Sequence, residues 1–178
     1  MSAVCSELRR AWIYHPNLDF DISTVPASGI ATVHARGSNP MRNRKSRQHN
    51  RMLGIKRFID TVNLILGKHS GLVVNRLAVK FELHKEHAND IDGWVSFAIS
   101  SKARDVVLNF SPYLGQHENN YSFPCHLFNN QNSSHLQVLR LYCVTLDPSH
   151  DFCGFSNLRT LSLEHVLILY CKICNSYY

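Results

Sequence analysis

Two eleven-residue segments near the C-terminus repeat the same apolar spacing without a gap, and this repeat limits the possible folds more than any other feature. LQVLRLYCVTL spans residues 136–146 and LRTLSLEHVLI spans residues 158–168, an offset of 22 residues. We predict that the matched apolar positions form the core of a repeat: Leu136, Leu139, Leu141, Val144 and Leu146, with Leu158, Leu161, Leu163, Val166 and Ile168. Replacing Leu139 or Leu161 with Ala should then cost about 2–5 kcal/mol.

This spacing is typical of leucine-rich repeats, in which a short strand carries leucines on one face and flanking apolar residues turn the chain back over them. One repeat cannot cover its own leucines, so neighbouring repeats stack and build a parallel sheet. Weaker copies, VNRLAVKF and ARDVVLNF, occur upstream, and the equivalent strand positions are residues 77, 106, 139 and 161. The sequence therefore predicts an α/β fold, a short irregular leucine-rich-repeat solenoid with a parallel sheet on its concave face.

Residues between the leucines of a strand point away from the core, because side chains alternate along a strand. Arg140 and Tyr142 occupy these positions in the first copy, and Ser162 and Glu164 occupy them in the second. We expect these four side chains to face a binding partner on the concave side of the sheet.

The chain divides into four predicted segments. Apolar residues at helical spacing predict helices that begin near Phe58 and near Gly93. The acidic residues Asp90 and Asp92 precede the second helix and are expected to cap it and to stabilise its dipole. In chain order the segments are a short helix with the strand pattern NLDFDI (1–22), a basic flexible insertion (23–57), the repeat domain (58–168) and a divergent tail (169–178).

Positive charge is concentrated in the N-terminal third of the chain. Residues 1–57 contain ten Lys and Arg against three Asp and Glu, whereas residues 58–178 contain nine against ten. We interpret the densest run as a solvated insertion, and a nuclear import signal or a phosphate-binding segment stays open as an alternative. No Phe, Tyr or Trp interleaves with the run to stack on bases, which disfavours nucleic acid. Its charged residues are Arg42, Arg44, Lys45, Arg47 and Arg51.

No pattern in the sequence predicts a catalytic, cofactor-binding or metal-binding site, so we expect a chain that is not an enzyme. Cys171 and Cys174 form a single Cys-x-x-Cys pair, but a structural zinc site needs four ligands. No apolar stretch reaches the roughly 18 residues of a membrane span, and we expect no membrane partner. Six dispersed cysteines favour reduced thiols and a cytoplasmic or nuclear location.

Three passages, in this order, resemble plant F-box/leucine-rich-repeat proteins of the RNI-like type. SELRRAWIYHPNLDFD resembles the end of an F-box and its exit strand, and FIDTVNLILGKHSG with VNRLAVKFEL resembles the first helix and strand of the repeat domain. The segments 136–146 and 158–168 resemble its repeats. Because only the last helix of the F-box precedes the repeats, and the pattern is lost after residue 168, we interpret the chain as truncated in its F-box and at its C-terminus.

The resemblance implies a substrate-recognition subunit of a cullin-type (SCF) E3 ubiquitin ligase. In such a subunit the F-box docks a Skp-like adaptor on the cullin scaffold, and the repeats present a target protein, which the sequence does not identify. Leu8 and Trp12 would be the remnant of the adaptor-docking helix, with docking impaired by the truncation. The alternative function is nucleic-acid binding through the basic residues 36–57.

Overall fold

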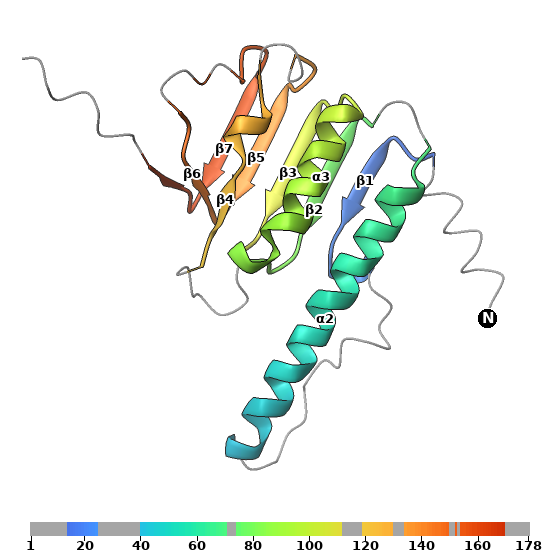
Figure 1. Cartoon of the computed structure of the whole chain (residues 1–178), viewed down its shortest axis with the longest axis vertical. Helices are drawn as coiled ribbons and strands as arrows, with labels where there is room; N and C mark the ends of the chain where they lie inside the picture. Colours follow the sequence, from blue (N-terminus) through green and yellow to red (C-terminus); the bar gives the residue numbers. More distant parts are fainter. Residues whose placement is uncertain are drawn as a thin grey trace, which may run out of the picture.

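The computed structural model describes residues 14–24, 40–70, 74–111, 119–129, 134–149, 152 and 154–169, and for residues 40–47 it describes the backbone alone. Within these residues a parallel sheet of five strands lies beside a parallel sheet of three shorter strands. Figure 1 shows two helices on one side of the larger sheet, one over its central strands and one beside its first strand.

The larger sheet confirms the predicted parallel stacking of the repeat strands. The predicted positions Leu77, Val106, Leu139 and Leu161 lie opposite one another on successive strands, and Leu141 lies opposite Leu163. Its strands, in spatial order, are β1 (Asn17–Phe20), β2 (Arg76–Lys80), β3 (Asp105–Asn109), β5 (Val138–Tyr142) and β7 (Thr160–Glu164).

The first strand, β1, extends this sheet beyond the predicted repeat strands. Leu18 pairs with Leu77 and Phe20 pairs with Val79, and all four side chains are buried. The alternating pattern of residues 17–20 therefore continues the two apolar columns of the repeats, because the register places its apolar residues beside theirs.

The smaller sheet is formed by the residues that follow each turn of the repeat. It contains β4 (Tyr121–Phe123), β6 (Val144–Leu146) and β8 (Leu167–Ile168), again in parallel. The turn between β5 and β6 places Cys143 at φ 57°, and the turn between β7 and β8 places His165 at φ 52°. These two residues are 22 positions apart, so the two repeats share their backbone turn as well as their leucines.

Two α-helices cover the apolar face of the larger sheet. Both predicted helices are present: α2 (Pro40–Lys68) buries Phe58 and Val62, and α3 (Ala88–Ser100) buries Ile91 and Trp94. Phe58 stacks on Phe81, with ring centroids 4.1 Å apart. Short 3₁₀ turns lie at η1 (Ile22–Thr24), η3 (Lys85–His87) and η4 (Cys125–Leu127).

Helix α2 corrects the prediction of a flexible insertion for residues 40–57, because its helical backbone begins at Pro40. Arg, Lys, Gln and Met have high helix propensity, proline is favoured at the first position of a helix, and extending a helix is far easier than nucleating one. A helix fixed to the core from Ile55 onward therefore continues into the charged run. Figure 1 shows this N-terminal part of α2 extending past the sheet. No helix of the described residues is long and apolar enough to cross a membrane.

Burial falls sharply at the last repeat, and this corrects part of the predicted core. Leu139 is 0% exposed, whereas its neighbour in register, Leu161, is 48% exposed. Leu146 is 6% exposed, whereas its partner Ile168 is 37% exposed. No strand among the described residues pairs with the outer edge of β7 or β8, so the predicted burial of Leu161 and Ile168 is wrong. The other predicted core residues are buried or packed against the core: Leu136, Leu141, Val144, Leu158, Leu163 and Val166.

Candidate protein-interaction surface

The candidate interaction surface is the face of the larger sheet opposite the leucines, and we call it the polar face. Its residues alternate along each strand with residues that point into the core. The polar face contains Asn17 and Asp19 of β1, Arg76, Ala78 and Lys80 of β2, Asp105, Val107 and Asn109 of β3, Val138, Arg140 and Tyr142 of β5, and Thr160, Ser162 and Glu164 of β7.

The structure brings together the four residues that the sequence placed toward a partner. Arg140 lies opposite Ser162, and Tyr142 lies opposite Glu164, on the adjacent strands β5 and β7. Glu164 is exposed, and the other three residues are half-buried. In-register residues on one face of a sheet are close enough to touch. The four side chains therefore form one continuous patch at the β5–β7 end of the polar face.

A chain of ion pairs crosses the polar face from β1 to β5. Arg76 donates from Nε to Asp19 Oδ1 at 3.0 Å, and its Nη1 donates to Asp105. Arg140 Nη1 lies 3.4 Å from both carboxylate oxygens of Asp105. Burial of the Arg76 guanidinium opposes its charge, but the hydrogen bond that it donates to Asp19 and the charge of Asp105 outweigh this and raise the pKa of Arg76.

This ion-pair chain was not found by the sequence analysis, because its members are far apart along the chain. Arg76 is 57 residues from Asp19 and 29 residues from Asp105. The signal is present only after the register is known, since the repeat then aligns Arg76 with Asp105 on neighbouring strands. The chain joins two arginines to two aspartates, so the charges of its four members cancel.

The charged run at residues 42–51 lies on the N-terminal part of α2 rather than beside the polar face (Figure 1). Of its members, the structure describes the side chain of Arg51 and only the backbone of Arg42, Arg44, Lys45 and Arg47. Arg51 forms an ion pair with Glu82, and its Nη2 lies 3.4 Å from His84 Nε2. One charge of the run is therefore neutralised within the chain. The predicted adaptor-docking residues Leu8 and Trp12, and the pair Cys171 and Cys174, lie outside the described residues.

The predicted role of Asp90 and Asp92 at the start of the helix is corrected in part: neither residue caps the helix, but Asp90 lies in its first turn, where a negative charge favours the helix dipole. Helix α3 begins at Ala88, with His87 as the N-cap, so both carboxylates lie inside the helix. Asp90 Oδ1 accepts a hydrogen bond of 2.8 Å from Asn63 Nδ2, and Asp92 Oδ1 accepts one from the Tyr121 hydroxyl. Burial, followed by the bond to Asp92, raises the pKa of Tyr121 far above its usual value. The two aspartates therefore tie α3 to α2 and to β4.

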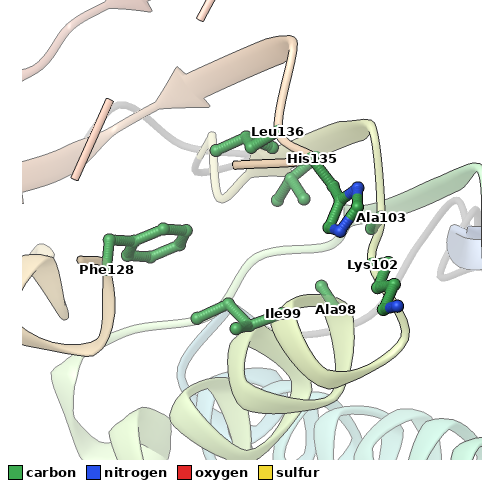
Figure 2. A pocket seen from close by; sticks show the side chains of 8 residues that line it. Ala98, Ile99, Lys102, Ala103, Phe128, His135 and Leu136 are labelled. Carbon is green, nitrogen blue, oxygen red and sulfur yellow. The ribbon is translucent and has the colours of Figure 1, made fainter. Parts of the chain in front are cut away.

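No metal centre is apparent among the described residues, where no three His, Cys, Asp or Glu side chains are grouped to hold an ion. Figure 2 shows a small cavity at the C-terminal end of α3, between Phe128 on one side and His135 with Leu136 on the other. Its volume of about 10 Å³ leaves room for about one water molecule, and its lining is largely apolar. This cavity is a packing gap rather than a ligand site.

Comparison with known proteins gives one match. The model of a family described as "At1g61320/AtMIF1, LRR domain" matches residues 65–177, which include β2, β3, β5 and β7. No curated protein and no solved structure matches the chain. The match thus covers most of the larger sheet and the whole of the patch formed by Arg140, Tyr142, Ser162 and Glu164.

Proposed function

Since the chain belongs to the leucine-rich-repeat family described as At1g61320/AtMIF1, LRR domain, we propose that it is a protein-interaction module that binds a protein partner through its polar face. One observation carries the proposal: the leucine register gathers Arg140, Tyr142, Ser162 and Glu164 into one accessible patch. Tyrosine is enriched among the few residues that supply most of the binding energy of protein interfaces, which favours Tyr142 as a contact. The proposed module is not an enzyme.

The β5–β7 end of the polar face is the part best suited to contact. Towards β2 and β3 the same face carries Ala78 and Val107, which are 0% and 3% exposed. Both side chains are buried, so this stretch of the face offers a partner little contact surface, whereas Glu164 on β7 is exposed. Glu164 and Tyr142 are therefore the principal contact residues of the proposal.

We further propose, from the F-box resemblance, that the module acts as the target-recognition subunit of a cullin-type E3 ubiquitin ligase in the cytoplasm or nucleus. The segment with Leu8 and Trp12 would contact a Skp-like adaptor, and the patch on β5 and β7 would contact the target protein. The order of the two parts along the chain supports this arrangement, because the adaptor segment precedes the repeats.

The interaction proposal is tested by site-specific cross-linking of the full chain. A benzophenone side chain placed at Tyr142 is compared with one at Ser96, which is exposed on α3. We expect the Tyr142 probe to capture a protein that the Ser96 probe does not. That protein is then purified and titrated against wild type and the variant Glu164→Ala, with an expected affinity loss of about tenfold. Equal capture from both sites, or an unchanged affinity, would overturn the proposal.

The ligase proposal has its own test. The full chain is titrated with a recombinant Skp-like adaptor, alongside the double variant Leu8→Ala, Trp12→Ala. Specific binding that the double variant loses supports the ligase role. Absence of adaptor binding by a chain that still binds its cross-linked partner removes the ligase role and leaves the interaction module intact.

A further inference from the structure

A groove separate from the polar face runs between α2 and the start of α3. Its volume is about 350 Å³, within the usual range for ligand sites. Helix α2 contributes one wall as a continuous helical stripe, and η3 with the first turn of α3 contributes the other. The lining residues are Met52, Ile55, Lys56, Ile59, Asp60 and Asn63 on α2, and Glu86, His87 and Asp90 opposite.

The floor of the groove is apolar and incompletely covered. Ile55 and Ile59 are each 9% exposed, and Met52, one turn closer to the N-terminus, is 63% exposed. Met52 therefore supplies most of the exposed apolar surface, and the two buried isoleucines contribute only a narrow strip at the bottom of the groove. Such a strip at the bottom of a groove accepts an apolar side chain or the aliphatic stem of a long one.

The rim of the groove is acidic. Asp60 from α2 and Glu86 and Asp90 from the opposite wall supply three carboxylates, against the single amine of Lys56. Asp90 Oδ1 accepts a hydrogen bond of 2.8 Å from Asn63 Nδ2, and this bond holds the Asp90 carboxylate at the groove. The Glu86 side chain is 65% exposed, and its Oε1 lies 4.0 Å from His87 Nε2. The Glu86 carboxylate is therefore accessible to a ligand.

We propose that this groove binds a lysine or arginine side chain carried by an apolar segment of a partner protein. The aliphatic stem would lie beside Met52, above the buried Ile55 and Ile59, and the cationic head would reach the carboxylates of Asp60 and Glu86. An apolar neighbour of that residue in the partner would cover Met52. Arginine stems and heads divide in this way between apolar and acidic surroundings.

Charge complementarity selects this occupant over others. An anionic ligand such as nucleic acid would meet three carboxylates, and the described residues contain no ligand set for a metal ion. The whole chain carries a net charge of +6, so a cationic segment is repelled by the protein as a whole. Binding of a cationic probe would therefore report a local site rather than general attraction.

The test uses the full chain and a fluorescent twelve-residue helical peptide with arginines on one face and leucines on the other. A second peptide carries glutamine in place of every arginine. We expect saturable binding of the first peptide and at least about tenfold weaker binding of the second. The double variant Asp60→Asn, Glu86→Gln should lose about tenfold in affinity for the arginine peptide, and Met52→Ser should weaken it separately.

A matched control separates this groove from the polar face. Glu164→Gln removes an exposed carboxylate from β7 and should leave peptide affinity unchanged. Equal losses from Glu164→Gln and from Asp60→Asn, Glu86→Gln would overturn the site, as would equal binding of both peptides. Self-association of the chain that the double variant abolishes would also overturn it, because the occupant would then be a second copy. Met52 and Glu86 are both well exposed, so their variants are expected to fold.

Discussion

Leu139 and Leu161 allow a direct comparison, because the repeat gives them the same position and the structure gives them different surroundings. Leu139 is 0% exposed between β3 and β7, whereas Leu161 is 48% exposed at the edge. Leu139→Ala should cost about 2–5 kcal/mol of unfolding free energy, since it loses transfer energy and leaves a cavity. Leu161→Ala loses about half of a transfer energy of roughly 2 kcal/mol and leaves no closed cavity, so it should cost about 1 kcal/mol.

The measurement is urea unfolding of the full chain at several protein concentrations. Both variants should shift the midpoint without changing the slope with urea, because the surface exposed on unfolding is nearly the same. Glu164→Ala, on the same edge strand as Leu161 but exposed on the polar face, serves as the control and should change stability by less than about 0.5 kcal/mol.

Equal costs for the two leucines would refute the reasoning from the edge. If Leu161→Ala cost as much as Leu139→Ala, the outer face of β7 would be covered in solution. A cost for Leu161→Ala that rises with protein concentration would identify the cover as another copy of the chain. Edge strands with exposed apolar side chains are prone to such pairing.

Four further substitutions follow from local geometry. A Cβ at Gly154 would lie 2.6 Å from the Phe128 Cβ and 2.7 Å from the Phe128 carbonyl oxygen, so Gly154→Ala should lower the midpoint of a thermal melt. Gly93 lies inside α3, and a Cβ there would meet no atom within 4 Å, so Gly93→Ala should raise the free energy of unfolding by about 1 kcal/mol. Burial lowers the pKa of His87, so the unfolded chain binds the proton more tightly than the folded chain. The free energy of unfolding should therefore fall as pH drops below about 6.5, and His87→Gln should reduce this dependence on pH in unfolding titrations. Asp105→Asn removes the carboxylate that pairs with both Arg76 and Arg140. It should lower the free energy of unfolding by about 1 kcal/mol at low salt, and by less at high salt.

The repeat strands could be predicted from the sequence because one local pattern fixes both their alternation and their register. The spacing of Leu77, Val106, Leu139 and Leu161 is enough to align four strands, and the structure pairs them in that alignment. A slip of one residue would turn every leucine to the polar face, so the pattern excludes registers displaced by an odd number of residues. The four proposed contact residues came from the same alternation.

The features that were missed depend on distant partners or on context. Residues 40–57 read as a solvated loop because they lack apolar periodicity, yet they extend a helix that is already fixed to the core at Phe58. The exposure of Leu161 depends on the lack of a further strand beside β7 in the described residues, which the repeat pattern itself does not encode. The groove beside Asp60 depends on how α2 and α3 meet, and no local signal sets that geometry.

The ion-pair chain changes which polar-face residues can determine binding specificity. The leucines set the register, so the exposed residues between them can vary more freely, whereas the buried Ala78 and Val107 cannot. Arg140 is an exception, because its guanidinium already lies 3.4 Å from Asp105 and a partner would have to compete with that contact. Glu164 forms no ion pair among the described residues, so a partner would not have to displace one there. Specificity should therefore reside at Tyr142 and Glu164, while Arg140 mainly holds β5 to β3.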